Sequence, residues 1–206
     1  MYIPKINLAT DRGEIIAFMK QFSFGAIVTA KDNLPVATHL PFIVSSNNDT
    51  IVLTSHFAKA NEQWKDLENN NALVIFSQPH AYISPGNYDK ELNVPTWNYI
   101  SVHAYGQGKL VTETESVFKV LENTIDYYET SYKQQWERFP LDYRLKMTNR
   151  IVAFEIIVTD LQAKKKLSQN RSQTEKQKII DSLSGSNDTN EQLVAQYMIK
   201  DQAVNK

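Results

Sequence analysis

The sequence of 206 residues contains little glycine and no cysteine. Its six glycines form no glycine-rich phosphate loop, no dinucleotide-binding turn and no nucleophile elbow. The absence of cysteine excludes disulfides, thiolate catalysis and cysteine-ligated zinc or iron–sulfur sites. A phosphate ligand must therefore be held by something other than a glycine-rich loop.

Long apolar runs are also absent. No stretch approaches the roughly 18 apolar residues that span a bilayer, and the first residues lack a cationic start followed by an apolar run. We therefore expect a cytoplasmic protein without a signal peptide or membrane contact. The length suits one domain with a substantial core, and 42% apolar and 22% charged residues are ordinary for a globular protein.

The formal net charge of −1 argues against a protein that binds polyanions over its whole surface. The charge is uneven, however, because residues 164–178 hold six Lys or Arg against one Glu. We call this segment the basic run. It indicates an ordinary solvated surface, a contact for a phosphate group, or a weak nucleic-acid patch.

The order of apolar patterns predicts secondary structure along most of the chain. Apolar and β-branched runs predict strands at residues 25–30, 35–44, 50–55, 72–77, 97–112 and 151–161. Turn residues predict a tight turn at Asp32 and Asn33 and a polar turn at residues 45–49. The prolines at 35 and 41 predict that the 35–44 strand is exposed on at least one edge.

Helical spacing and capping signals predict helices at residues 11–22, 60–68, 112–131, 141–150, 174–183 and 190–200. Capping boxes are predicted at Asp11 with Glu14 and at Thr112 with Glu115. The buried face of the 112–131 helix would consist of Phe118, Leu121, Ile125 and Tyr128. Since helices and strands do not alternate strictly, we expect an antiparallel β-barrel of the α+β class, with inserted and C-terminal helices. Residues 1–184 would form the domain, and residues 185–206 a linker and a peripheral helix.

Three segments carry more polar and aromatic side chains than packing requires. Residues 54–64 place hydroxyls and Lys59 just ahead of a predicted helix, which suits an anion or simple capping by Ser55. Residues 78–99 hold three prolines and large aromatics, which predicts a rigid loop that stacks on a flat ligand or folds over the barrel end. Residues 166–171 are mostly polar and form either a ligand contact or a helix start capped by Ser168 or Asn170.

The four histidines, His39, His56, His80 and His103, never stand at the spacing of a local metal site. We therefore expect no metal. The sequence names no catalytic residue and leaves open whether the protein is an enzyme.

Seven short motifs stand out along the chain: MYIP at residues 1–4, HLP at 39–41, AN with a later Trp at 60–64, PHAYISP at 79–85, VPTWNY at 94–99, HAYG at 103–106 and KLSQNR at 166–171. In this order, these motifs resemble those of one family, the PaiB-type FMN-binding negative transcriptional regulators. The resemblance implies the FMN-binding split barrel and a homodimer with two FMN sites at the subunit interface. The family's usual H-x-A-R-A-N-P is here HFAKANE at residues 56–62, so lysine replaces the arginine that could grip a phosphate with two bonds.

The resemblance also implies where FMN lies. The phosphate would fall on the step that follows the third strand, the ring system would lie along the second strand, and later segments would complete the pocket, some from the other subunit. The implied cofactor-binding residues are Thr38, His39, Leu40, Thr54, Ser55, His56, Lys59, Trp97, Asn98, Lys166, Gln169, Asn170 and Arg171.

The implied function is that of a dimeric transcriptional repressor, yet the sequence contains no helix-turn-helix signature. The basic run is the candidate DNA surface. A flavin-dependent oxidoreductase or flavin reductase that uses NAD(P)H is the main alternative, since the cofactor carries the chemistry in such proteins. A haem-binding or haem-degrading split barrel is a weaker one.

Overall fold

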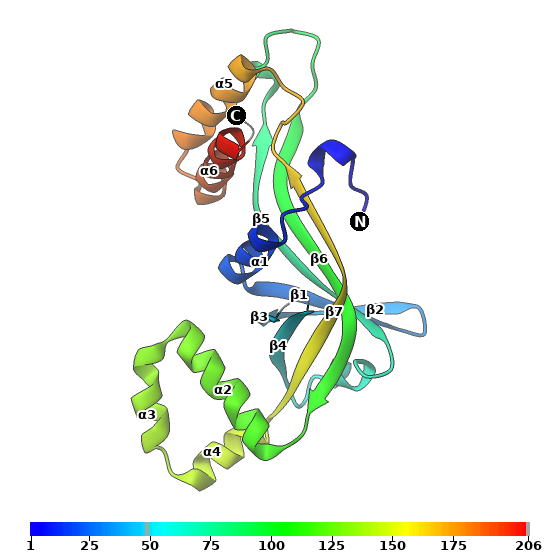
Figure 1. Cartoon of the computed structure of the whole chain (residues 1–206), viewed down its shortest axis with the longest axis vertical. Coiled ribbons are helices and arrows are strands. Elements are labelled where there is room, and N and C mark those ends of the chain that lie inside the picture. The colour runs from blue at the N-terminus through cyan, green and yellow to red at the C-terminus, as the bar shows by residue number, and fades with distance from the viewer. Residues whose placement is uncertain (48–49, 205–206) are drawn as a thin grey trace. The chain divides into compact units, whose positions relative to one another are not determined.

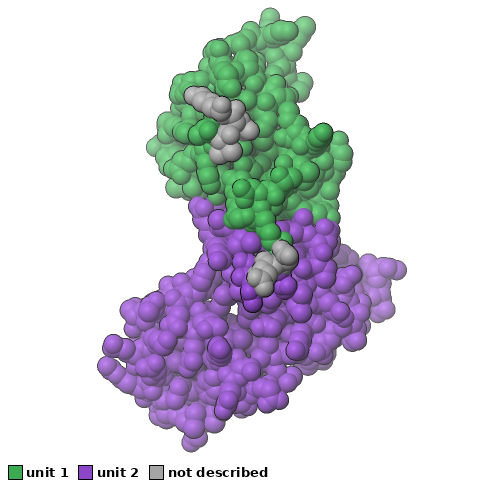
Figure 2. All heavy atoms as spheres, viewed as in Figure 1, with its two compact units in different colours: residues 1–15, 77–102, 162–206 green, residues 16–76, 103–161 purple. Residues whose placement is uncertain are grey.

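The computed structural model describes residues 1–47 and 50–204. The chain divides into two compact units, coloured separately in Figure 2. Unit 1 consists of residues 1–15, 77–102 and 162–206, and unit 2 of residues 16–76 and 103–161. Three long strands have residues in both units: β5 (Asn71–Ile83), β6 (Thr96–Val111) and β7 (Ile151–Lys166).

The other elements, apart from α1, each lie within one unit (Figure 1). Unit 2 contains strands β1 (Phe24–Lys31), β2 (Leu34–Pro41), β3 (Ile43–Asn47) and β4 (Thr50–Ala58), and helices α2 (Thr114–Tyr128), α3 (Lys133–Arg138) and α4 (Leu141–Thr148). Unit 1 contains α5 (Gln173–Ser184) and α6 (Thr189–Val204), and α1 (Arg12–Gln21) begins there and ends in unit 2. The 3-10 helices are η1 (Lys5–Asn7), η2 (Glu62–Asp66), η3 (Pro85–Asn87) and η4 (Thr130–Tyr132).

The strands form one seven-stranded sheet in the order β2-β1-β5-β6-β7-β4-β3. Strand β1 pairs antiparallel with β2 and β5, and β4 pairs antiparallel with β3 and β7. The two end strands, β2 and β3, are joined by Phe42 alone. Because one residue links opposite ends of the strand order, the sheet must curl until its edges approach each other. The predicted α+β split barrel is confirmed.

Phenylalanine rings fill the core of unit 2. Phe42, Phe57, Phe76 and Phe154 are all fully buried. Phe42 makes edge contacts with Phe76 and Phe154, at centroid distances of 5.7 Å and 6.4 Å. Phe57 and Phe154 stack at 4.9 Å. The residue that joins β2 to β3 is therefore also an anchor of the core.

The turn predicted at Asp32 and Asn33 is confirmed. Both residues have left-handed backbone, with φ of 51° and 64°, and they connect β1 to β2 in a register that pairs Lys31 with Leu34. Two-residue hairpin loops favour this conformation, and Asp and Asn adopt it more readily than most residues. Strand β2 is an end strand, as its two prolines predicted.

The predicted single strand at residues 35–44 is wrong, because the structure breaks it into β2 and β3. At the break, the Phe42 N–H donates to the carbonyl of Ser23, 2.8 Å away, which continues the β1–β2 register for one more residue before β3 begins. The polar turn expected at residues 45–49 starts later than predicted, since β3 continues to Asn47. Residues 48–49 of that turn lie outside the described residues.

The rigid loop expected from residue 78 begins six residues too early, since residues 78–83 belong to β5. Proline cannot donate to a strand ladder, but the pairing of β5 with β1 ends at Ile75, before Pro79. The alternation of buried Ala81 and Ile83 with exposed Tyr82 continues the strand pattern. The aromatic surface predicted here is therefore partly strand.

Most of the predicted helices are present, but several differ from the prediction in their caps or their lengths. Asp11 caps α1 by accepting the Glu14 N–H at 2.9 Å, as predicted. The capping box of Thr112 and Glu115 is wrong: α2 follows Glu113, which makes no side-chain cap bond. The predicted helix at 60–68 is the shorter η2, with Leu67 fully buried. Helix α3 was not predicted, because six residues give too short a periodic pattern.

The buried face of α2 also differs from the prediction. Val117 and Val120 are buried and pack with Ala153, Val111 and Ile151. The expected face of Phe118, Leu121 and Ile125 is only half-buried, and Tyr128 is exposed. The two valines contact the ends of β6 and β7. This contact, rather than the size of the apolar side chains, determines which face of α2 is buried.

The two terminal helices are confirmed, and α5 and α6 lie side by side in unit 1 (Figure 1). Ser172 caps α5 in a capping box with Glu175, so the alternative cap at Ser168 or Asn170 is wrong. Helix α6 buries Val194, Ala195 and Met198 within unit 1, whereas the boundary at residue 184 stays a prediction. Among residues 1–47 and 50–204, no helix has both the length and the apolar character that a membrane crossing requires.

Gly106 is required by the close approach of β6 to β7. A Cβ at this position would lie 2.2 Å from the carbonyl oxygen of Ile157, which backbone cannot accommodate without moving. We expect Gly106→Ala to lower the unfolding free energy by about 1–3 kcal/mol in urea denaturation. Gly185→Ala is the matched control, since its nearest atom is 3.5 Å away. An equal loss in both variants would show that strand contact is not the reason for Gly106.

Candidate functional site

The predicted site residues form two groups, one in each unit, and each group is built separately. Unit 2 holds the group Thr38, His39, Leu40, Thr54, Ser55, His56 and Lys59. Unit 1 holds the group Trp97, Asn98, Lys166, Gln169, Asn170 and Arg171.

In unit 2, Thr38 belongs to a polar cluster that ties η2 to the β1–β2 hairpin. Its hydroxyl donates to Gln63 Oε1 at 2.6 Å and accepts from Asn61 Nδ2 at 2.9 Å. The buried Gln63 amide donates in turn to the carbonyls of Ile27 and Val36. The sequence did not indicate Gln63, because nothing in a local pattern marks a polar residue whose partners are about 30 positions away. Thr38 is therefore held in one position by side chains of η2.

Residues 54–56 follow the alternation of strand β4. Thr54 and His56 are half-buried on one face, while Ser55 lies on the buried face. The Ser55 hydroxyl donates to the carbonyl of Pro41 at 2.6 Å. It does not cap η2, since Asn61 does so by accepting the Gln63 N–H. Thr54 and Ser55 thus point in opposite directions from the strand.

Lys59 is exposed and lines a pocket of about 280 Å³ in unit 2. The indole N–H of Trp64, which also lines this pocket, donates to the Lys59 carbonyl at 3.2 Å. The other lining residues are Leu110, Val111, Thr112, Thr114, Val117, Thr148, Asn149, Ile151 and Val152. Of the seven predicted residues of unit 2, Lys59 alone lines this pocket.

The two predicted histidines of unit 2 lie in different surroundings. His39 is exposed on β2, and its ring stacks on Phe24 at a centroid distance of 6.2 Å. His56 is half-buried on β4, and burial lowers its pKa from the ordinary value of 6.5. His39 therefore offers a flat polar ring at the surface, and His56 is neutral at neutral pH.

The lowered pKa of His56 predicts a pH-dependent stability. The unfolded chain binds the proton more readily than the folded chain, so stability falls as the pH falls below 6.5. We expect the melting temperature of His56→Gln to fall less than that of the wild type between about pH 7 and about pH 5. His103, whose pKa burial also lowers, contributes equally to both proteins. An equal fall in the melting temperatures of both proteins over this range would contradict the assignment of this pH dependence to His56.

In unit 1, the four predicted residues of the 166–171 segment and Asn98 meet in a second pocket of about 280 Å³. Trp97 is not among its lining residues. The pocket also includes residues that the prediction missed: Pro4, Ile6, Asn7, Val94, Pro95, Thr96 and Ser168. Most of these residues lie in or beside the MYIP and VPTWNY motifs. Those motifs are the sequence feature that could have identified them. The described residues that line the pocket include two cations, Lys166 and Arg171, and no carboxylate, which suits an anionic ligand.

Lys166 ends strand β7, and its ammonium group is held at the pocket. It donates to the Trp97 carbonyl at 2.8 Å and to the Thr96 hydroxyl. Burial lowers the pKa of Lys166 from 10.5, so its charge is poorly solvated. A bound anion would stabilise the charged ammonium group of Lys166 in place of the lost water.

The turn after Lys166 is shaped by its own side chains. The Gln169 amide accepts the Leu167 N–H at 2.8 Å and donates to the Lys165 carbonyl at 2.6 Å. Ser168 has left-handed backbone, with φ of 58°, which favours glycine and stores strain in a serine. Its hydroxyl donates to the fully buried Asn98 at 3.1 Å. The predicted role of Gln169 is therefore to hold the turn as well as to line the pocket.

Two aromatic contacts flank this pocket's residues. Arg171 lies over the ring of Tyr88, 3.6 Å from guanidinium carbon to ring centre. Trp97 is 52% exposed, and its ring contacts His80 and Tyr82, each at a centroid distance of 5.9 Å. The stacking surface expected from residues 78–99 is present at Trp97. Cations, amide donors and an exposed flat ring together fit a ligand with an anionic group and an aromatic system.

The comparison with known families decides the assignment. The family model described as "Putative FMN-binding domain" matches residues 1–160. The chain is also 38% identical, over 96% of both chains, to the Bacillus subtilis protein named "Protease synthase and sporulation protein PAI 2". The chain belongs to this PaiB-type FMN-binding family. Family membership, together with the donor set of the pocket, supports FMN as the cofactor.

Solved structures share the fold at low sequence identity. The flavocytochrome Anf3 from Azotobacter vinelandii aligns with a TM-score of 0.60 at 16% identity, over 80% of this chain and 72% of that chain. The FAD and heme binding protein from Mycobacterium smegmatis aligns with a TM-score of 0.60 at 13% identity, over 78% and 73%. These likenesses show the split-barrel fold.

Proposed function

We propose that this PaiB-type chain is a homodimeric, cytoplasmic FMN-binding protein that acts as a negative regulator of transcription. One observation carries the FMN part: the pocket of unit 1 presents two cations and several amide and hydroxyl groups without a carboxylate. The regulatory part rests on the Bacillus subtilis relative, whose name connects it with protease synthesis and sporulation.

FMN supplies the redox chemistry when it is bound, and the chain supplies binding and orientation. Lys166, Asn98 and Asn170 would donate to its oxygens, and the exposed ring of Trp97 would offer a stacking surface. The unit 2 group, in which Gln63 and Asn61 hold Thr38, stays a separate prediction for contact with the ring system.

Exposed apolar side chains support the homodimer. In unit 1, Tyr2, Leu92 and Val94 are 83%, 96% and 73% exposed. Val94 also lines the pocket. We propose that a second copy covers these side chains and completes the FMN site, since burial of exposed apolar surface favours association.

The basic run is a poor candidate for the DNA surface. Lys164 is buried, donates to the Tyr2 carbonyl and lies 5.2 Å from the ring centre of Tyr99. Lys165 pairs with Glu14 and Asp201 at 3.1 Å and 3.0 Å. Lys178 pairs with Asp89 at 2.8 Å. Since much of this charge is engaged inside unit 1, DNA binding would have to use other residues.

Sedimentation of the purified protein, followed at the flavin absorbance, tests the proposal in one experiment. A species of twice the chain mass that carries flavin supports it, and a colourless monomer contradicts it. A gel shift with the DNA upstream of the protein's own gene, in low salt, tests the repressor part. Absence of any shift, together with bleaching of the flavin by NAD(P)H, would favour the oxidoreductase alternative.

A further inference from the structure

Glu175 is a nearly fully covered carboxylate, 8% exposed, at the start of α5. One oxygen accepts the backbone N–H of Ser172 at 3.2 Å, and the other accepts the backbone N–H of Asp89 at 3.1 Å. These bonds lower the pKa of Glu175 below its ordinary value, the Asp89 bond most. The side chain therefore carries its charge and joins the helix start to a segment more than eighty residues earlier.

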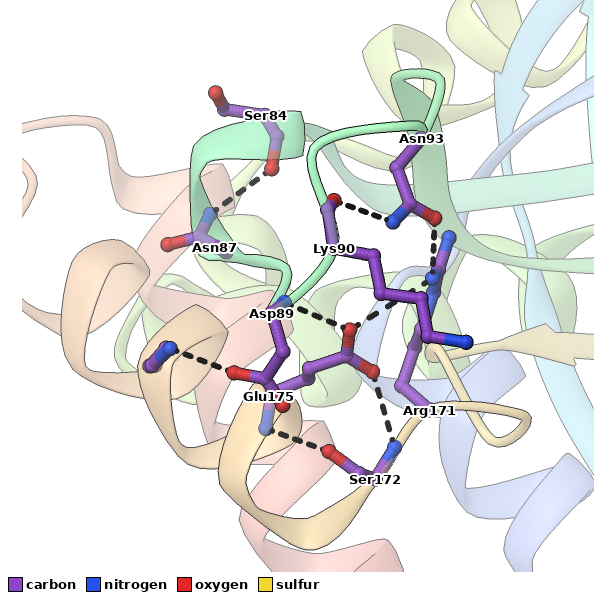
Figure 3. A network of polar contacts seen from close by, with 9 residues as sticks. Ser84, Asn87, Asp89, Lys90, Asn93, Arg171, Ser172 and Glu175 are labelled. Carbon is purple, nitrogen blue, oxygen red and sulfur yellow. Dashed lines mark hydrogen bonds and ion pairs between the residues drawn. The ribbon is translucent and has the colours of Figure 1, made fainter.

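Arg171 makes a second connection to the same segment. Its Nη1 donates to Asn93 Oδ1 at 2.9 Å and lies 3.9 Å from Glu175 Oε1. Its guanidinium covers the Tyr88 ring. Figure 3 shows Glu175 between Asp89 on one side and Arg171 and Ser172 on the other, with Asn93 beyond Arg171. We call Glu175 and Arg171, with these partners, the clamp.

The clamped segment, residues 88–95, contributes Val94 and Pro95 to the wall of the unit 1 pocket. These two residues follow Asn93 directly, and Arg171 lines the same pocket. Residues 89–92 lie outside the strands and helices, and Leu92 is almost fully exposed. Apart from the pair between Lys178 and Asp89, the side-chain contacts described for residues 88–93 that reach another segment all go to the clamp. Tyr88 is itself buried, so the clamp is the polar anchor of the residues that follow it, from Asp89 to Asn93.

We propose that Glu175 is a positioning residue of the cofactor site: it fixes the wall formed by residues 88–95, and so sets the affinity of the pocket for FMN. The inference rests on the proposed function, because it takes FMN as the ligand of this pocket. Arg171 then has a double role, since one of its nitrogens is used in the clamp and the others remain for the ligand. Glu175 itself touches no ligand.

Glu175→Gln tests the proposal with minimal change of shape. Glutamine at this position still permits a capping box, but it has one acceptor oxygen and cannot accept from Ser172 and Asp89 together. It also removes the charge that faces Arg171. We expect FMN binding, measured by quenching of flavin fluorescence, to weaken about tenfold. Amide hydrogen exchange in residues 88–95 should speed up in the absence of FMN.

Lys178→Gln is the matched control on the same helix. It removes an ion pair to Asp89 in which both side chains are 48% exposed, and such pairs contribute little. We expect its FMN affinity and its exchange in residues 88–95 to equal those of the wild type. Asn93→Ala is a second variant that breaks the Arg171 bond without touching α5, and it should weaken FMN binding in the same direction. This second variant still tests the proposal if Glu175→Gln does not fold.

The outcomes separate the two proposals. A wild type that binds no FMN overturns the proposed function. A wild type that binds FMN, with Glu175→Gln and Asn93→Ala binding it equally well, overturns the positioning role. A lower melting temperature with unchanged FMN affinity would also overturn it, since that result assigns Glu175 to stability alone. Weaker binding with faster exchange confined to residues 88–95 supports it.

Discussion

Phe154→Ala is expected to lower the unfolding free energy by about 3–5 kcal/mol. The ring is fully buried in unit 2, where it stacks on Phe57 and meets the edge of Phe42. Its removal takes away apolar contact and leaves a cavity beside the residue that links β2 to β3, which backbone strands cannot easily collapse to fill. Urea denaturation followed by circular dichroism measures the change.

Leu34→Ala provides the control for this core prediction. The Leu34 side chain is 68% exposed, so its truncation should change the unfolding free energy by no more than about 0.5 kcal/mol. If Phe154→Ala lost no more stability than Leu34→Ala, the four phenylalanines would not form the centre of the barrel. The argument that Phe42 closes the sheet would then lose its support.

Lys166→Met is expected to weaken FMN binding between about tenfold and about a hundredfold. Methionine keeps the length and apolar stem of lysine but removes a charge that burial leaves poorly solvated. The bonds of Lys166 to Thr96 and Trp97 hold that charge in the pocket, so the loss falls on the ligand contact. Flavin fluorescence quenching at constant ionic strength gives the two dissociation constants.

Two lysines serve as comparisons for Lys166. Lys178→Met removes a charge from the same basic run outside the pocket, and it should leave FMN affinity unchanged. Lys59→Met tests the phosphate position that the family resemblance implied in unit 2. A large loss in Lys59→Met with none in Lys166→Met would move the phosphate from the unit 1 pocket to the pocket beside Trp64.

The barrel could be predicted from the sequence because its signals are local. Alternating apolar residues mark most strands, and Asp32 and Asn33 mark the hairpin through conformations that few other residues adopt. The continuation of β5 past Pro79 could not be predicted, because a proline usually indicates the end of a strand. Only the structure shows that the pairing of β5 with β1 ends before Pro79. The break at Phe42 depends on the closure of the whole sheet, which no local pattern contains.

The candidate site also contains some residues that the sequence indicates and others that it does not. Lys166, Asn170 and Arg171 could be named from the sequence because the polar motif that contains them follows a core strand and belongs to the family resemblance. Gln63 and Glu175 were missed, because each is defined by partners far away in the chain: Ile27 and Val36 for one, Asp89 for the other. A buried polar residue at an ordinary helix position carries no sign of such contacts.

The most direct test of the central claim compares FMN with riboflavin, which has the same ring system without the phosphate. If the cations of the unit 1 pocket hold the phosphate group, FMN should bind with one molecule per chain and at least about tenfold more tightly than riboflavin. The difference should shrink as ionic strength rises. Equal affinity for the two flavins, or binding of neither, would contradict the account.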